Sequence, residues 1–407
     1  MQFLRDFIDK NIAPHVAPDG KYPWLHSTWD ALDTFLFTPN TTTKGKVHVR
    51  DGMDLKRTMD HVIKALVPCL LFAMWNVGYQ HFSVVEGIEW TNWGDKFFTE
   101  LFYGALTVLP VVVTAYLVGL AIDFYFCTIR HEQVNEGFLV TGMLIPLIMP
   151  PTIPLWMVAL ATAFAVIITR EAFGGTGMNV LNVALSARVF LFFAYPTDLS
   201  GEAVWIVINN NFLTDLIGFQ DISGSLVDGY TGATYLGQAV SNGGNFITAA
   251  GAPASIWDAF AGWIPGSIGE TSAVACILGG IILIGTGIGS WRVMVSIVLG
   301  GLAMGYLLNM VADGDAFMSM PGWYHIFVGG FLFGTVYMAT DPVTAAQTNQ
   351  GKFIYGFLIG FIAVLIRVLN PAYPEGMMLA ILLMNVSAPL IDYFVVQGNV
   401  KRRLSRG

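Results

Sequence analysis

The chain has 407 residues, of which 55% are hydrophobic and only 12% are charged. Soluble globular chains carry about 25% charged residues. The composition therefore leaves too little polar surface to cover a water-soluble body, and it excludes the roughly two or three soluble domains that this length would otherwise accommodate. The net charge of −8 says little by itself, because the charged residues are sorted along the chain.

Residues 1–60 are polar and carry charges of both signs, and we expect them to form a cytoplasmic N-terminal extension with some helix. The first residues lack the apolar region of a signal peptide. The extension therefore precedes the membrane part of the chain without belonging to it.

Ten apolar segments follow, and a helix needs about 20 residues to cross the hydrocarbon of a bilayer. They divide the chain into a first half, 61–196, and a second half, 271–396, with a polar loop at 197–270 and a basic tail at 397–407. Prolines interrupt the third segment, and short or broken helices are tolerated only inside a bundle or beside a polar cavity. We expect the segments at residues 62–80, 97–122, 137–150, 153–168, 183–196, 271–289, 292–311, 322–340, 353–369 and 376–396.

The two halves resemble each other in sequence. Gly-Phe-Leu at 137–139 recurs at 330–332, an offset of 193 residues, and the apolar run at 165–168 recurs at 363–366, an offset of 198. Five spans in each half make the second copy inverted, which is the plan of transporters and channels. The predicted fold class is an all-α integral membrane protein of about ten transmembrane helices in two inverted five-helix repeats, with chance similarity between apolar helices as the alternative.

Lysine and arginine sort to one side if the segments alternate with the N-terminus inside, as the positive-inside rule requires. The outside loop, 197–270, contains no lysine or arginine, and Lys96 and Arg367 are exceptions to the pattern. Both termini are therefore predicted to be cytoplasmic. The residues predicted inside are Arg50, Lys56, Arg57, Lys64, Arg130, Arg170, Arg292, Lys352 and Lys401 to Arg403.

Cys69, Cys127 and Cys276 are scattered through apolar stretches without a CxxC pair, so neither a disulfide framework nor a complete zinc or iron–sulfur site is encoded. We expect buried apolar thiols. A G-x-G-x-x-G word after a strand is also absent, so NADH is not expected to bind this chain.

The outside loop contains the short motif Thr231-Gly232-Ala233-Thr234, within a stretch rich in Gly, Asn, Ser and Asp. As a bare pattern it is weak, because four small residues occur by chance in any glycine-rich loop. A surface turn is the alternative to a function.

The chain resembles the subunit designated B of the bacterial Na+-translocating NADH:quinone oxidoreductase over nearly its whole length. The subunit designated D of the Rnf ferredoxin:NAD oxidoreductase represents a sister family that shares the flavin motif, but it usually lacks so long an N-terminal extension. The resemblance rests on short motifs rich in polar residues, proline and glycine, at residues 49–51, 54–57, 135–138, 150–156, 173–177, 264–270, 341–343 and 367–376.

The resemblance implies that FMN is esterified through its phosphate to Thr234. A hydroxyl is needed for the phosphoester, and the small neighbours Gly232 and Ala233 let an attaching enzyme reach it. Thr231 is the second hydroxyl of the motif. We expect the loop to be accessible to that enzyme outside the membrane, while the flavin supplies the electron chemistry.

Riboflavin, held without a covalent bond, is the second cofactor that the resemblance implies, with contacts from Asn179 and Asn182. The alternative is that these residues only cap a helix. The family usually has Arg in place of Met178 and Pro in place of Val183, so this sequence departs from the pattern beside the site.

Three acids, Asp123, Asp341 and Asp392, fall at the predicted cytoplasmic ends of spans, and the resemblance associates them with Na+ uptake. Such a carboxylate costs a few kcal/mol unless it is paired, hydrated or bound to a cation. An interfacial charge at a helix end is the alternative. Arg188 lies within a span, and its alternative partners are a carboxylate, a flavin phosphate and a flavin carbonyl.

The quinone site of the family lies partly near the end of the second span, which places Gly119 there, with a glycine at a helix–helix contact as the alternative. The leading hypothesis is therefore a redox-driven sodium pump subunit that passes electrons from partner subunits through FMN and riboflavin to quinone. The expected surroundings are the other subunits and the bacterial inner membrane, with no nucleic acid. An Rnf-type subunit and a plain solute channel remain alternatives.

Overall fold

The computed structural model describes residues 55–86, 93–130, 137–201, 205–207, 232–248, 253–370 and 375–406, with short pieces of the first 49 residues. These ranges are mostly helical. They contain a two-stranded antiparallel ribbon of β1 (Phe246–Ile247) and β2 (Pro253–Ala254), and one of the N-terminal pieces forms the short helix α2 (Ala13–Val16).

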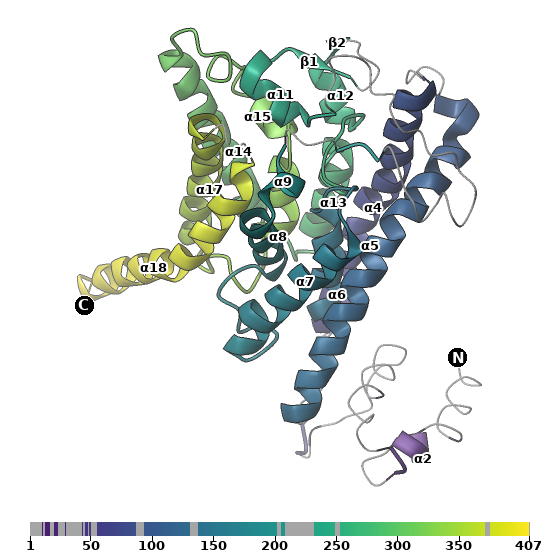
Figure 1. Cartoon of the computed structure of the whole chain (residues 1–407). Coiled ribbons are helices and arrows are strands. Elements are labelled where there is room, and N and C mark those ends of the chain that lie inside the picture. The colour runs from purple at the N-terminus through teal and green to yellow at the C-terminus, as the bar shows by residue number, and fades with distance from the viewer. Residues whose placement is uncertain are drawn as a thin grey trace.

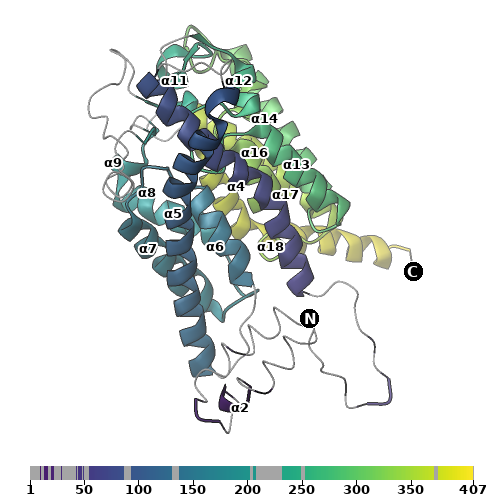
Figure 2. The same ribbon diagram turned by 90° about the vertical axis from the view of Figure 1, so that its right-hand side faces the viewer.

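The first half contains two long helices and three short ones. The long helices α4 and α5 pack side by side along the molecule, and α6 lies against both (Figures 1 and 2). Beyond α7 the chain continues through a π-helical turn at Ala165–Arg170 and a short turn at Glu171–Phe173. The helices are α4 (Leu55–Glu86), α5 (Trp93–Arg130), α6 (Gly137–Leu147), α7 (Leu155–Phe164) and α8 (Val183–Ala194).

The second half is built around α14 and α17, whose backbones touch. A Cβ added to Gly360 would lie 1.9 Å from the carbonyl oxygen of Ile297, and one added to Gly300 would lie 2.1 Å from that of Phe357. Glycines therefore bring the two helices together, as in other membrane bundles. The helices are α13 (Ala273–Gly285), α14 (Trp291–Val311), α15 (Tyr324–Phe327), α16 (Phe331–Phe333), α17 (Asn349–Leu369) and α18 (Gly376–Leu404).

Each predicted apolar segment contains helix, and six helical stretches of the described residues are long and apolar enough to cross a membrane. This makes the chain a mostly helical, multi-pass membrane protein. Three further apolar helices, α6, α8 and α13, are shorter. The six long stretches are Arg57–Val84, Lys96–Arg130, Leu155–Phe173, Trp291–Val311, Asn349–Leu369 and Gly376–Leu404.

The predicted span at 322–340 differs from a continuous helix. It is divided into α15, α16 and a π-helical turn at Gly334–Met338, because Gly329 adopts a left-handed conformation (φ +68°) that interrupts the helix. The break lies inside the bundle, where irregular backbone is tolerated in a membrane.

The end of α6 shows how a broken helix is accommodated. Pro150 and Pro151 follow the helix closely and cannot continue its hydrogen bonding, so its last carbonyl groups need other partners. The backbone N–H groups of Gly269 and Ile268 donate to the carbonyls of Leu147 and Met149 at 2.6 and 2.9 Å. The loop before α13 is thereby held against the broken end of α6.

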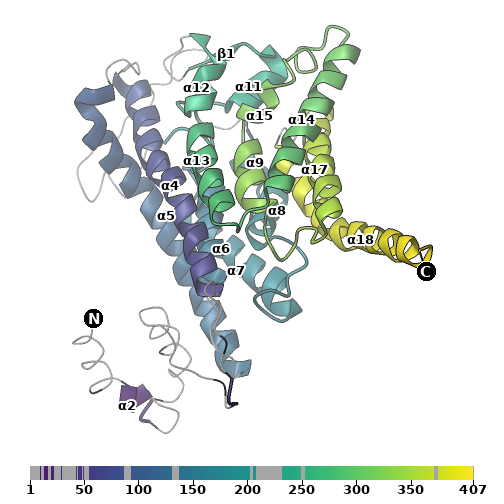
Figure 3. The same cartoon turned by 180° about the vertical axis from the view of Figure 1, so that it is seen from behind.

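Most of the described part of loop 197–270 lies at one end of the molecule, at the top of Figures 1 and 3. It contains α9 (Pro196–Leu199), α11 (Tyr235–Asn242), the β-ribbon and α12 (Ile256–Ala261). The first turn of α4 and the C-terminal end of α18 lie toward the opposite end (Figures 2 and 3). The thiols of Cys69 and Cys276 are buried, as predicted, with 4.0 Å between their sulfur atoms, while Cys127 is half-buried.

Candidate cofactor and cation sites

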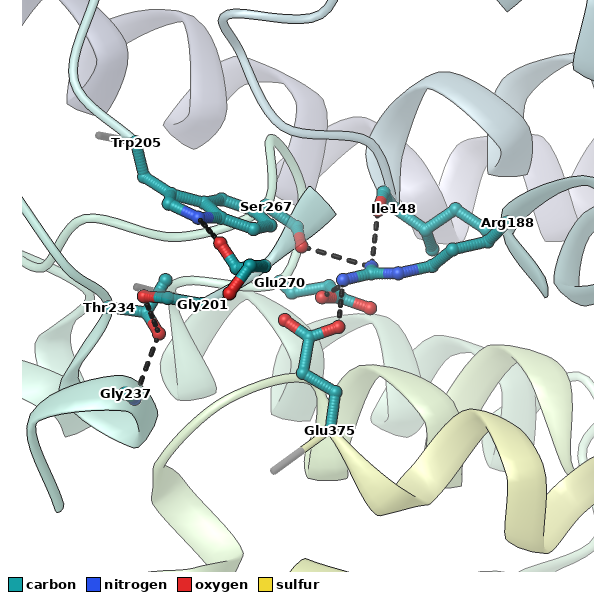
Figure 4. Close-up of polar contacts among 10 residues, drawn as sticks. Ile148, Arg188, Gly201, Trp205, Thr234, Gly237, Ser267, Glu270 and Glu375 are labelled. Atoms are coloured by element: carbon teal, nitrogen blue, oxygen red, sulfur yellow. Dashed lines mark hydrogen bonds and ion pairs between the residues drawn. The ribbon is translucent and has the colours of Figure 1, made fainter. Parts of the chain in front are cut away.

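Thr234 begins the helix α11. Its hydroxyl oxygen accepts a hydrogen bond from the backbone N–H of Gly237 at 3.1 Å, which is the N-cap arrangement, and its hydroxyl group lies 3.4 Å from the carbonyl oxygen of Gly201 (Figure 4). The backbone N–H of Thr234 donates to the same Gly201 carbonyl at 3.1 Å. Thr234 is therefore fixed between the start of α11 and the segment that follows α9.

The described part of the motif 231–234 is buried, although the sequence predicted an accessible loop. Thr234 is 7% exposed, and Ala233 is also buried. The neighbouring Trp205 is buried as well, and its backbone N–H donates to the carbonyl of Gly232 at 3.1 Å. Thr231 lies outside the described residues. An enzyme that attached FMN to Thr234 would have to move the surrounding chain before it reached the buried hydroxyl.

The surroundings of Thr234 fit a phosphoester. The first N–H groups of a helix favour phosphate, both by hydrogen bonding and through the helix dipole. The threonine oxygen can keep accepting from Gly237 after esterification, because an ester oxygen retains lone pairs. The cavity beside Thr234 measures about 20 Å³, which suits a water molecule and not a flavin ring, so the fit covers the phosphoester end only.

A larger cavity, of about 110 Å³, lies where the two halves meet. We call it the inner cavity. It is bounded by the first turns of α4 and α6, the chain before α8, the end of α13 and the segment after the second π-helical turn. Its polar lining residues are Thr58, Thr141, Arg170, Thr176, Asn179, Asn182, Tyr337, Thr340 and Asp341.

Asn179 and Asn182 both line the inner cavity, and Asn182 is also a helix cap. Its side-chain oxygen accepts from the backbone N–H of Leu185 at 3.1 Å at the start of α8, while the Asn179 amide donates to the carbonyl of Leu181 at 3.0 Å. Capping and ligand binding are thus compatible for Asn182, because its Nδ2 group remains a donor. A flavin carbonyl would be a suitable acceptor, but the cavity is smaller than the roughly 300 Å³ of typical ligand pockets, so its walls would have to move for a flavin to enter.

Met178 and Val183, where this sequence departs from the family pattern, differ in their exposure to solvent. Met178 is 66% exposed, whereas Val183 is buried as the first residue of α8. Proline suits such a first position because its missing N–H has no helical partner there. Valine accepts the same backbone, since α8 begins normally after the Asn182 cap.

Asp341 also lines the inner cavity, and Asp392 supports the same loop. Asp341 accepts hydrogen bonds from the backbone N–H of Val343 at 3.1 Å and the hydroxyl of Thr344 at 2.9 Å. Asp392 accepts from the N–H of Gln347 at 2.7 Å and from the N–H and hydroxyl of Thr348 at 3.0 and 2.5 Å. The loop 341–348 is therefore held at both ends by predicted Na+ acids. Burial raises the pKa of the Asp341 carboxyl, against the effect of its two hydrogen bonds.

Asp123 is placed differently from the other two acids. It is 1% exposed, lies seven residues before the end of α5 and forms an ion pair with Arg170 at 3.0 Å, so it is not an exposed charge at a helix end. Arg170 lines the inner cavity and also contacts the hydroxyl of Thr176. Asp123 thus reaches the cavity only through Arg170.

Gly119 lies at a helix–helix contact and not on the inner cavity. A Cβ at this position would lie 1.8 Å from the ring of Phe138 on α6. The guanidinium of Arg170 lies 5.8 Å from the centre of the same ring. We call Gly119, Phe138 and Arg170 the Phe138 unit.

A buried charge cluster was not predicted as a site. The Arg188 guanidinium donates to the carbonyl of Ile148 and to Ser267 at 3.0 Å, and it pairs with Glu270 at 3.1 Å and with Glu375 (Figure 4). Of the alternative partners of Arg188, the structure shows carboxylates, those of Glu270 and Glu375, while the contact with the backbone carbonyl of Ile148 was not predicted. The available signal was a charged residue within an apolar helix, which in a membrane marks a functional position.

Comparison of the sequence with known proteins identifies the family of the chain. Residues 42–401 match the model of the NQR2, RnfD, RnfE family. Similar relatives are the subunits designated B of Na(+)-translocating NADH-quinone reductases. That of Stutzerimonas stutzeri is 45% identical over 422 residues, that of Ectopseudomonas mendocina 44% over 422 residues, and that of Neisseria meningitidis serogroup B 42% over 426 residues. Each alignment covers 99% of both chains. The chain belongs to the NQR2, RnfD, RnfE family.

Proposed function

We propose that this chain is the flavin-carrying membrane subunit of a redox-driven sodium pump. Electrons that originate from NADH reach quinone through covalent FMN and riboflavin, and Na+ is exported. The observation that carries the proposal is the full-length match to relatives named as subunits of Na(+)-translocating NADH-quinone reductase, at 42% to 45% identity. The subunit lies in the bacterial inner membrane among its partner subunits, with both termini in the cytoplasm.

The described residues support a division of tasks along the molecule. Thr234 offers its hydroxyl at the start of α11, where helix N–H groups favour a phosphate. At the inner cavity Asn179 and Asn182 offer amide donors, and Asp341 offers carboxylate oxygens. FMN and riboflavin supply the electron chemistry when bound, and the protein supplies position and electrostatics.

A shared packing unit supports two inverted five-helix repeats, and with them about ten spans. Phe331 in the second half repeats the environment of the Phe138 unit. The guanidinium of Arg367 lies 5.5 Å from the centre of its ring, and a Cβ on Gly301 of α14 would meet the ring at 2.7 Å. Both phenylalanines belong to the Gly-Phe-Leu motif that occurs once in each half of the sequence, at 137–139 and 330–332. The same glycine, phenylalanine and arginine therefore occur in the same order in each half.

The domain division follows from the same argument. We propose a cytoplasmic extension at 1–60, repeats at 61–196 and 271–396, an outward flavin-bearing loop at 197–270 and a cytoplasmic tail at 397–407. Most of the described part of the loop and the end of α18 lie toward opposite ends of the molecule, which supports this arrangement (Figure 1).

Two alternatives predict different outcomes. A plain solute channel on the same repeat carries no flavin. An Rnf-type subunit carries the flavin but assembles with ferredoxin- and NAD-reacting partners. The relatives named above favour the quinone reductase over both.

The test is in-gel flavin fluorescence after denaturing electrophoresis of the purified complex. The chain should fluoresce, Thr234→Ala should abolish the signal while the protein still inserts, and Thr231→Ala should retain it as the matched control. Covalent flavin in the Thr234→Ala protein would contradict the attachment site. Identification of the co-purified subunits distinguishes the two redox alternatives.

A further inference from the structure

The cluster around Arg188 has a second arginine beside it. The Arg367 side chain is fully buried, and its Nη1 group donates to the carbonyl of His325 at 2.6 Å. Its Nε and Nη2 groups have no hydrogen-bond acceptor among the described residues. Unsatisfied buried donors are rare and costly, above all on a charged group, so they call for an explanation.

Both glutamates that pair with Arg188 lie within the same small pocket as Arg367. This pocket is lined by Arg188, Arg367, Glu270 and Glu375 together with apolar residues of α8, α18 and the second π-helical turn. Arg188 holds both carboxylates, while Arg367, on α17 of the other half, holds neither. The cluster thus contains two arginines and two glutamates, but both glutamates pair with the same arginine, Arg188.

The two glutamates also line the small cavity beside Thr234. They therefore separate that cavity, at the outer end, from the pocket of the two arginines. Arg188 further binds the carbonyl of Ile148 at the broken end of α6. Carbonyls at such breaks hold the transported cation in other transporters, so the guanidinium occupies a position that suits a cation.

We propose that Glu270 and Glu375 exchange between Arg188 and Arg367, and that this exchange gates the passage of the transported cation. The inference rests on the proposed sodium pump and names the residues that control its outer passage. In the arrangement seen here Arg188 closes the passage. When the two carboxylates move to Arg367, its unsatisfied Nε and Nη2 donors gain acceptors and Arg188 is released from both glutamates.

Charge and space both permit this exchange. Two arginines and two glutamates balance in either arrangement, so no net charge is buried or exposed, and a guanidinium in the passage is an electrostatic barrier to cations. A Cβ on Gly330 would lie 2.5 Å from the carboxylate of Glu270, and one on Gly329 would lie 3.3 Å from Nη2 of Arg367. The two glycines therefore leave the room that the side chains need.

The test uses the purified complex in proteoliposomes, with Na+ uptake and quinone reduction measured together. Arg367→Met removes the second partner but leaves the pairs of Arg188 intact. The membrane should stay tight, and Na+ taken up per electron should fall several-fold while flavin content is unchanged. Arg367→Lys, which keeps the charge, should restore part of the coupling. Arg292→Met, an arginine that stacks on Trp291 away from the cluster, is the control.

Arg188→Met tests whether Arg188 keeps the passage closed to Na+. With the resident cation removed, Na+ should leak into the vesicles without NADH. If this variant does not assemble, because two carboxylates lose their partner, Arg367→Met decides alone. Wild-type Na+ per electron in Arg367→Met would overturn the exchange. A wild-type complex that reduces quinone without moving Na+ would instead refute the sodium pump itself.

Discussion

Asp123 and Arg170 form an ion pair of 3.0 Å in which both side chains are buried. Removing one partner of a buried pair leaves an uncompensated charge, which costs about 3–5 kcal/mol. Glu171 lies 3.7 Å from the same guanidinium and offsets part of this loss. We therefore predict that Asp123→Ala lowers the thermal unfolding temperature of the complex by several degrees, measured in detergent by intrinsic fluorescence.

A second substitution at Asp123 distinguishes a structural role of this residue from an ion-binding role. Because the carboxylate contacts Arg170 and not the cavity, Asp123→Asn should keep part of the stability and a near-normal Na+ requirement. A raised Na+ requirement in a variant of undiminished stability would place Asp123 on the ion path instead.

Asn182 is predicted to contact riboflavin through its amide while its oxygen caps α8. Asn182→Asp keeps an oxygen for the N–H of Leu185 but loses the donor, so riboflavin should be lost and the helix kept. Asn182→Ala should lose both, at a further cost of about 1 kcal/mol for the missing cap. Riboflavin extracted per complex is the measurement, with the Thr234-linked FMN as internal reference.

Ser272 provides a matched control, because it caps α13 through the N–H of Ala275 and does not line the inner cavity. Ser272→Ala should cost similar stability and no riboflavin. Replacing Asn179 and Asn182 together with Leu is the stronger test. Unchanged riboflavin in that double variant would remove the site from the inner cavity.

Gly119 is predicted to act through packing before any contact with quinone. In Gly119→Ala the new methyl group meets the ring of Phe138, and overpacking of this kind costs about 1–3 kcal/mol. Thermal unfolding and the KM for quinone should be measured together. Gly398→Ala, where no atom lies within 4 Å of the added Cβ, is the control that should change neither.

A compensating change decides between packing and quinone binding. Phe138→Leu in the Gly119→Ala background makes room for the methyl group, so stability should recover. A KM for quinone that stays high in this double variant would show that Gly119 itself borders the quinone site.

The apolar segments and the end of α6 could be predicted, because hydropathy and proline act locally. Pro150 and Pro151 leave α6 without a continuation, and the helix ends at Leu147, within three residues of the end of the predicted segment 137–150. The break in the segment 322–340 was not predicted. Its cause is the backbone conformation of Gly329, and a glycine in an apolar run does not reveal its φ angle.

Candidate site residues could be picked out one by one from the sequence, but the residues that they contact could not. Arg188 stood out as a charge in an apolar helix, yet Glu270 lies 82 residues away and Glu375 lies 187 residues away. Contacts over such separations depend on how the helices pack. The same holds at Thr234, whose backbone N–H donates to the carbonyl of Gly201, a residue outside the motif.

Asp341 and Asp392 are predicted to admit Na+, and their hydrogen bonds let the two roles be separated. Na+ is a hard cation that prefers oxygen ligands, as other hard cations do. Asp341 has the lighter structural role, because it accepts two hydrogen bonds from its own turn, at Val343 and Thr344. Asp341→Ala should therefore raise the Na+ concentration for half-maximal quinone reduction by about tenfold, which corresponds to about 1.4 kcal/mol, with unchanged flavin content.

Asp392→Ala should raise the Na+ requirement and also lower stability, because the start of α17 loses the acceptor for Gln347 and Thr348. Acidity provides an independent check on Asp341. Since burial raises its pKa, protons compete with Na+ at a higher pH than they would at an exposed aspartate. As the pH falls, the Na+ requirement of the wild type should rise, and that rise should be absent in Asp341→Asn. If both alanine variants keep the wild-type Na+ dependence at every pH, the two acids only hold the loop 341–348 and the ion enters elsewhere.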